Sequence, residues 1–312
     1  MQEEFIMAME TLREISIKFA KKQPQMVEYL TEEAPILDVC KWTAASHNLW
    51  NAAEVVHDIT GPSYVKMDDE LPNVGASTRM EKIDLNILGG EMEVPQDKAK
   101  QMGGFAAYFA KKTPLILKQA GNDTELKLFQ DNWRAFGIAN KNVISAGGTG
   151  TGLNTILCVR FDEASNVGLY NPNQFKQGAL LETEFLNNGA LHRLKHPPYV
   201  GVNGYAMQMK GHFGWQMLNP KTIGGIVNIN AANKPTEIMM DDMITNARGT
   251  SKNTYIFCHP RALTHFINHL KVNKLHTVIA DKAMNTIFDS WNGIPIITSY
   301  NLLWNGENSV TV

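Results

Sequence analysis

Two histidines, His265 and His269, have the spacing of a metal-binding pair, four positions apart in a stretch that reads as a helix. That spacing places both imidazoles on one helix face, where they could ligate a metal ion. A hydrolytic site would also need a glutamate between them, but the sequence there is His-Phe-Ile-Asn-His. His259 and His276 are candidate third ligands, although no motif fixes their geometry. Exposed or hydrogen-bonded histidines explain the pattern equally well, and we expect no metal ligand here.

The glycine-rich segment from Gly147 to Gly152 has the composition of a phosphate-binding loop. Such a loop follows a strand and opens a helix, whose N-terminus meets the anion. Here the glycines lead into Leu153 to Phe161, an apolar and β-branched run that predicts a strand, and no Gly-Lys-Ser/Thr follows. We therefore expect the glycines to relax the backbone at a domain junction rather than to bind a nucleotide or another cofactor.

The remaining polar residues form no catalytic constellation. The sequence lacks a Gly-x-Ser-x-Gly elbow, and the acidic residues 68–70 are typical of a solvated turn. The three cysteines, Cys40, Cys158 and Cys258, are too far apart in sequence to suggest a disulfide framework or a zinc site. Cys158 and Cys258 lie in apolar runs and should be buried. We expect no catalytic, cofactor-binding or metal-binding residue.

Composition narrows the class of protein further. The 312 residues are 44% hydrophobic and 19% charged, which is ordinary for a globular protein with a large core. Lys and Arg number 29 against 31 Asp and Glu, for a net charge of -2, so the chain lacks the cation excess of a dedicated nucleic-acid binder. It has neither a signal-peptide pattern nor an apolar run of about 18 residues, so we expect no membrane partner.

Two helical stretches should position the first half of the chain. Residues 3–21 form an amphipathic pattern, which fits either a core helix or an arm helix that docks on another subunit. Residues 96–136 are mostly helical, but Pro114 and Gly121-Asn122 predict a kink or a break.

Between these helices, residues 60–94 read as a long hairpin with a polar tip near 68–75. Ile83, Leu85 and Ile87 alternate with other residues and should form one apolar face. An isolated hairpin buries too little apolar surface to offset its chain entropy, so this one should lie on something. Its own domain and a neighbouring subunit are both candidates.

The second half of the chain alternates strands and helices without a βαβ repeat, which indicates an α+β fold. We expect strands at 153–161, 166–170, 205–215, 223–229, 255–258 and 293–298, and helices at 239–247, 261–270 and 278–288.

Several short motifs, in order along residues 33–300, resemble the major capsid proteins of short-tailed and related bacteriophages, which have the Hong Kong 97-type coat fold. The clearest is the Ala-Gly-Gly loop at 146–148, followed by a strand and then by Val167-Gly-Leu-Tyr-Asn-Pro172. The other motifs are Glu33-Ala-Pro-Ile-Leu-Asp38, Ser77-Thr78, Leu88-Gly-Gly-Glu-Met-Glu-Val94, Phe136-Gly-Ile138, Gly214-Trp215, Ile226-Val-Asn-Ile229 and Trp291-Asn-Gly-Ile-Pro-Ile296.

This resemblance implies an architecture. It assigns 1–56 to an N-terminal arm and 57–94 to an extended hairpin, the E-loop. Residues 95–140 and 205–235 would form a peripheral domain with a spine helix, and 141–204 and 236–312 an axial domain near the capsomer centre.

The resemblance also implies a structural protein rather than an enzyme. Hexamers and pentamers of the chain would build an icosahedral virion shell around double-stranded DNA, assembled in the host cytoplasm. Scaffolding and portal proteins would be partners, decoration proteins would be optional ones, and the DNA would be contacted weakly and non-specifically. The alternative is a metal-dependent hydrolase or other small-molecule enzyme that uses the His265/His269 pair or the Gly147–Gly152 loop.

Overall fold

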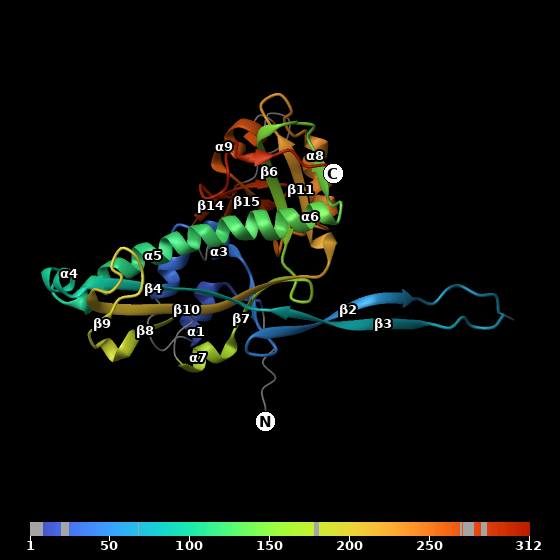
Figure 1. Ribbon diagram of the computed structural model, residues 1–312. Coiled ribbons are helices and arrows are strands. Elements are labelled where there is room, and N and C mark those ends of the chain that lie inside the picture. Colours follow the sequence, from blue (N-terminus) through green and yellow to red (C-terminus); the bar gives the residue numbers. More distant parts are fainter. Residues whose placement is uncertain are drawn as a thin grey trace.

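The structure is a computed structural model that describes residues 9–19, 25–67, 69–177, 181–268, 270, 278–281 and 286–312. Two sheets form the body, with a long helix running along it, and a two-stranded ribbon projects away from it (Figure 1). Helices and strands are mixed without a repeating unit, so the expected α+β class is confirmed.

The first sheet is built around β10, its longest strand. It has six strands in the order β1-β7-β10-β4, with β8 and β9 also pairing with β10. The strands are β1 (Trp42–Ala44), β4 (Asn86–Pro95), β7 (Asn166–Tyr170), β8 (Glu182–Phe185), β9 (His192–Arg193) and β10 (Asn203–Met217). Only β1 and β7 run parallel, so the sheet is otherwise antiparallel.

The second sheet has eight strands in the order β13-β14-β15-β12-β6-β11-β5, with β16 also pairing with β6. Its strands are β5 (Val143–Ser145), β6 (Thr151–Arg160), β11 (Ile223–Ile229), β12 (Thr254–Cys258), β13 (Val278–Asp281), β14 (Thr286–Trp291), β15 (Ile294–Thr298) and β16 (Glu307–Asn308). β11 is buried throughout, as its continuous apolar run predicts. The helix α8 (Glu237–Asn246) packs so closely on this strand that a Cβ on Gly224 would lie 2.1 Å from the carbonyl oxygen of Met243.

The long helix differs from the expectation of a kink at Pro114 or Gly121. After α4 (Gln96–Gln101), one helical rod runs through α5 (Phe105–Lys127), the π-helical segment η1 (Leu128–Arg134) and α6 (Ala135–Ala139) (Figure 1). The break lies earlier instead, at Gly103 and Gly104, whose φ values of 88° and 109° favour glycine. Pro114 lies inside α5 without ending it.

Gly121 has a packing role rather than a breaking one. A Cβ at this position would lie 2.0 Å from the carbonyl oxygen of Leu30, in the helix α2 (Gln25–Thr31). The missing side chain therefore lets α2 lie directly against α5. A glycine that reads as a helix breaker in the sequence is here a site of close helix approach.

The N-terminal helix is shorter at its start than the expected 3–21. Among the described residues it is α1 (Leu12–Phe19), while 1–8 and 20–24 lie outside them. Thr11 and Glu14 explain the start, because the Thr11 hydroxyl accepts the Glu14 N–H and the Glu14 carboxylate accepts the Thr11 N–H. Glu10 instead pairs with Trp42 as a β-bridge. A short helix α3 (Pro35–Val39) follows α2.

The hairpin is formed by β2 (Trp50–Thr60) and β3 (Gly75–Asp84), which pair from Trp50↔Asp84 to Thr60↔Gly75. Its ends therefore lie near Trp50 and Asp84, not near residues 57 and 94 as expected. The strand that was expected to return from it, β4, pairs with β10 in the body.

A further difference concerns residues 278–288, which were expected to be helical. The described part of this stretch contains the antiparallel strands β13 and β14. Asn292 and Gly293, with φ values of 50° and 78°, turn β14 back into β15 as a tight hairpin. This pairing gives the β-branched residues of the stretch a sheet to join.

The two sheets also divide the chain at other residues than those expected for the two domains. β11 belongs to the second sheet, with β6, rather than with β10, and β7, β8 and β9 belong to the first sheet. The shared core lies beneath the long helix, where Trp133 is fully buried and its ring stacks on Phe257 at 5.1 Å between centroids. The shorter helical pieces are α7 (Pro172–Gln177), η2 (Leu186–Gly189), η3 (Pro220–Thr222), α9 (Pro260–Ala262) and η4 (Leu263–Ile267).

Candidate functional site

The projecting hairpin carries the most exposed apolar side chains of the described chain. Tyr64 and Met67 are fully exposed in the segment that joins β2 to β3. The other exposed large hydrophobic residues on the hairpin are Val56, Ile59, Val65, Leu71, Val74 and Met80. Figure 1 shows that this ribbon stands clear of the body along most of its length. Apolar side chains gathered on one projecting element are typical of a surface that another chain covers.

The apolar face expected from Ile83, Leu85 and Ile87 is not on the free part of the hairpin. Leu85 is buried against the body, next to Val167 and Leu169, and Ile83 packs on the same cluster. Ile87 belongs to β4 and is exposed. Leu85 and Ile83 therefore anchor the base of the ribbon, whereas its exposed apolar side chains come from β2, β3 and the tip.

Polar side chains fix the base of the hairpin. The side-chain amide of Asn51 donates to the side-chain oxygen of Gln216 at 2.7 Å, and its oxygen accepts the N–H of Ser46 at 2.9 Å. The ring of His47 stacks on Trp50 at 3.7 Å between centroids. The ribbon thus leaves the body in a defined direction.

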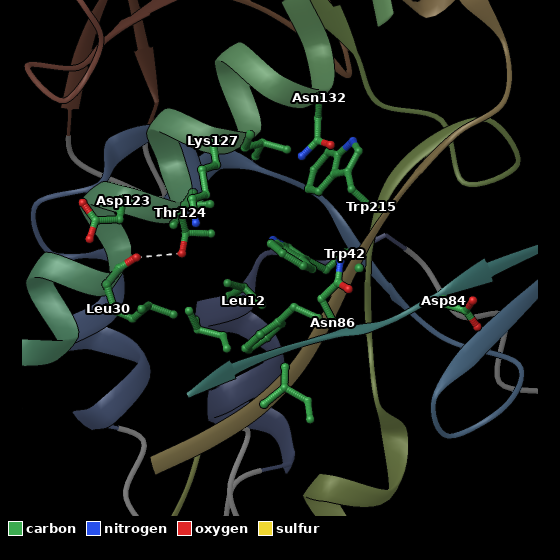
Figure 2. Close-up of a pocket in the computed structure, with 17 residues that line it drawn as sticks. Leu12, Leu30, Trp42, Asp84, Asn86, Asp123, Thr124, Lys127, Asn132 and Trp215 are labelled. Atoms are coloured by element: carbon green, nitrogen blue, oxygen red, sulfur yellow. Dashed lines mark hydrogen bonds between the residues drawn. The ribbon is translucent and has the colours of Figure 1, made fainter. Parts of the chain in front are cut away.

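A groove of about 570 Å³ lies between the long helix and the first sheet. Figure 2 shows Trp42 and Trp215 facing Thr124 and Lys127 across it. The buried indole Nε1 of Trp42 has no hydrogen-bond partner among the described residues. The lining contains no histidine, cysteine or serine among these residues, so it offers no nucleophile with a histidine base. Its aromatic walls suit apolar contact.

The glycine-rich loop connects β5 to β6, so a strand follows it as expected. Gly147, Gly150 and Gly152 have positive φ values of 95°, 86° and 78°. Gly148 differs, because its φ is not positive but a Cβ there would lie 2.4 Å from the carbonyl oxygen of Asn228. The loop's own groups are occupied by the chain: the Gly148 N–H donates to Asn228 O at 2.9 Å, and Gly150 O accepts Ser309 N–H at 2.8 Å.

Of the candidate metal ligands, His269 and His276 lie outside the described residues, so the His265/His269 pair is described only at His265. The His265 ring lies 5.7 Å from that of Trp304. His259 precedes α9, and its Nδ1 accepts the N–H of Arg261 at 3.1 Å, which makes it a helix cap. Burial, followed by the neighbouring Arg261 charge, lowers the pKa of His259.

The cysteines are buried as expected for Cys158 and Cys258, and Cys40 is buried as well. Burial raises the pKa of the Cys158 and Cys258 thiols to about 12, so these groups stay protonated and unreactive at neutral pH.

One cluster of possible metal ligands was missed in the sequence. Ligand atoms of Glu91, Glu93 and His196 lie within 4.8 Å of one another. The Glu93 carboxylate accepts the N–H groups of Lys195 and His196 at 2.9 and 3.0 Å, and Glu91 Oε2 lies 3.2 Å from His196 Nε2. These contacts attach the loop that follows β9 to the strand β4. The Glu-Met-Glu alternation on one strand face was the available signal, but His196 is remote in sequence.

Comparisons with known proteins establish the fold. No protein-family model matches the chain, and no curated protein matches it in sequence. A solved structure of bacteriophage Epsilon15 is similar, with a TM-score of 0.52 and 15% sequence identity over 88% of this chain and 88% of that chain. A chain of the bacteriophage JBD30 capsid is similar with a TM-score of 0.50 and 10% identity, over 94% of this chain and 99% of that one.

These likenesses extend over nearly the whole of each chain, so they concern the complete fold rather than one motif. The chain has the Hong Kong 97-type coat fold, which the ordered motifs of the sequence had predicted. Within the described residues, no helix is long and apolar enough to cross a membrane.

Proposed function

We propose that this chain is the major capsid protein of a tailed bacteriophage, and that its copies assemble into the icosahedral head shell around double-stranded DNA. The observation that carries the proposal is the projecting hairpin with its exposed apolar tip, on a fold shared with a chain of a phage capsid. Within the described part of the chain, the groove beside the long helix has no nucleophile with a histidine base in its lining, so it does not support the alternative of a metal-dependent hydrolase or other small-molecule enzyme.

The hairpin explains how subunits would hold one another. Its base is fixed to the body by Asn51 and Leu85, so the free part of β2 and β3 can reach only outward. Covering an exposed apolar side chain such as Tyr64 or Met67 contributes about 1.5–3 kcal/mol. Each subunit would offer such a ribbon to a neighbour and receive one, and many weak contacts of this kind close a shell cooperatively.

The two sheets correspond to the two domains of this architecture. We assign the first sheet and the long helix to the peripheral domain and the second sheet to the axial domain near the capsomer centre. The arm and hairpin then occupy the chain up to Asp84. We therefore place the hairpin between Trp50 and Asp84 rather than at 57–94, and we divide the domains by their sheets, which moves β11 from the 205–235 segment to the axial domain and β7, β8 and β9 from the 141–204 segment to the peripheral domain.

Assembly into a shell implies several partners for the chain. The main partner is a second copy of the chain, in hexamers and pentamers, and scaffolding and portal proteins would guide assembly. Decoration proteins would be an addition to the finished surface. The net charge of -2 supports only weak, non-specific contact with the packaged DNA.

Replacing residues 55–79 by a short Gly-Ser turn tests the proposal. This change keeps the pairing from Trp50↔Asp84 to Glu54↔Met80 and leaves β4 intact. The variant should remain folded by circular dichroism but form no closed shells in electron micrographs, whereas the parent chain forms them. Shells of normal size from the variant would show that the hairpin is not an assembly element. Failure of the parent chain to form capsomers or shells would contradict the proposed function itself.

A further inference from the structure

The segment from Asn305 to Val312 lies against the second sheet and the π-helical part of the long helix. After Trp304 the chain forms β16, which pairs with β6 through Glu307↔Leu153 and Asn308↔Thr151. From Asn305 to Val312, Glu307 is the only buried side chain, at 4% exposure. The segment therefore adds little to the apolar core, and polar contacts hold it in place.

The Glu307 carboxylate fills a socket made by other elements. Gln130 Nε2 donates to its Oε1 at 2.5 Å, and the Thr155 hydroxyl donates to its Oε2. Arg134 Nε lies 3.4 Å from Oε2, and the Arg134 side chain is itself only 14% exposed. Gln130 and Arg134 both lie on η1, and π-helical turns are often found at functional sites. The socket is thus a partly buried cation with two further donors, which fits a single carboxylate.

Two asparagines bind the main chain of the segment on either side of this socket. Asn228, with a φ of 60°, accepts the Val310 N–H at 3.0 Å and donates to the Val310 carbonyl at 2.8 Å. Asn154 accepts the Asn305 N–H at 2.9 Å and donates to the Asn305 side-chain oxygen at 2.8 Å. Paired donor and acceptor contacts of this kind recognise an extended peptide.

We propose that η1, β6 and β11 form a binding site for an extended peptide that carries a glutamate, and that the C-terminal segment of a second copy of this chain fills it in exchange for the resident one. The site recognises main-chain groups, one carboxylate and the side-chain oxygen of Asn305, all of which a second copy supplies identically. Exchange replaces each of these contacts by the same contact from another copy, so the bound states before and after exchange have the same contact energy. This interaction is separate from the hairpin and does not depend on shell formation.

Two full-length variants with opposite defects test the exchange. Glu307→Arg places a cation against Arg134 and should release the segment from its own socket. Arg134→Glu leaves the segment unchanged but places an anion against Glu307. In each variant alone, hydrogen exchange at the amides of Ser309 and Val310 should be at least tenfold faster than in the parent chain. In an equimolar mixture each segment meets a socket of opposite charge on the other chain, and the parent protection should return.

Isotope labelling of one variant lets mass spectrometry distinguish the two chains, so that slow hydrogen exchange in the mixture can be assigned to the segment of each. One chain that carries both substitutions is the matched control, and it should recover protection by itself. If Arg134→Glu does not fold by circular dichroism, Gln130→Glu brings the same repulsion to the socket. Fast exchange that persists in the mixture would overturn the proposal, while protection in the mixture alone supports it. Electron microscopy of the same samples reports shell formation separately.

Discussion

The carboxylate of Glu125, in the middle of the described core, accepts the backbone N–H of Ile36 with 2.6 Å between the two heavy atoms. Its second oxygen accepts the hydroxyl of Ser299 at 2.7 Å and the side-chain amide of Asn301. One fully buried side chain on α5 therefore joins the long helix to the start of α3 and to the segment after β15. Buried carboxylates are retained where their hydrogen bonds are complete, as they are here.

Glu125→Ala should destabilise the subunit by about 3 kcal/mol, because it leaves the Ile36 N–H and the Ser299 hydroxyl buried without an acceptor. Urea unfolding monitored by circular dichroism measures this loss. Gln119→Ala, on an exposed part of the same helix, is the control and should change the free energy of unfolding by no more than about 0.5 kcal/mol. Equal effects of the two substitutions would show that the Glu125 contacts do not hold the elements together.

The same carboxyl should make stability depend on pH. Burial raises the pKa of Glu125 above its ordinary value of 4.5, although its hydrogen bonds act in the opposite direction. The folded chain then holds this proton more tightly than the unfolded chain does. Stability from this group is therefore full below pH 4.5 and is lost as the pH rises through the folded pKa. The difference in melting temperature, parent minus Glu125→Gln, should fall as the pH is raised through this window. A difference that grows with pH would contradict the direction of the shift.

The sequence was most informative where burial alone decides the structure. Strands were predicted at 223–229 and 293–298, where the sequence is largely apolar, and the structure has them at 223–229 and 294–298. Predictions failed where a segment distant in sequence decides the local structure. Gly121 reads as a helix breaker until Leu30 is seen against it, and the described residues of 278–288 form strands because β15 offers an edge for pairing.

The polar sites were even harder to predict, because their residues come from distant parts of the sequence. Glu307 and Gln130 are separated by 177 residues, and no local pattern relates them. The hairpin base was misplaced because alternation at Ile83 and Leu85 marks a buried face without saying whether a neighbour or the body buries it. Short motifs in a fixed order carried the fold prediction, since they reflect the whole topology rather than local propensity.

Gly121→Ala should destabilise the subunit by about 1–3 kcal/mol, since the new methyl group would collide with the carbonyl oxygen of Leu30 and displace α2. This direction is opposite to the usual effect of alanine in a helix, which is favourable. Thermal unfolding of the variant measures it. Gly90→Ala is the matched control, because no atom lies within 4 Å of a Cβ at that position. A more stable Gly121→Ala chain would show that α2 does not pack as closely as described.

Gly148→Val should impair folding rather than a catalytic step. A Cβ at position 148 would lie 2.4 Å from Asn228 O and 2.9 Å from Leu153 Cδ2, and neither the backbone nor the core can move away without disturbing β6 and β11. Soluble yield and melting temperature should both decrease relative to Gly61→Val, where the surroundings are open. Equal solubility and heat resistance of the two variants would show that the loop is not constrained by packing.

Replacing Tyr64, Met67 and Leu71 together by serine tests the hairpin tip without shortening it. All three side chains are highly exposed in the subunit, so the free energy of unfolding should change by no more than about 0.5 kcal/mol. In a shell each would be covered by a neighbour, and the loss of about 1.5–3 kcal/mol per side chain and per subunit should prevent closure. Ile238→Ser is the control, because it replaces an exposed apolar side chain of α8, on the body, by the same polar residue.

Melting curves and electron micrographs, taken at the same protein concentration, distinguish a defect in assembly from a defect in folding. A triple variant that forms normal shells would remove the tip from the assembly interface. One that unfolds at lower temperature would place these side chains in the subunit's own core, against their exposure in the structure.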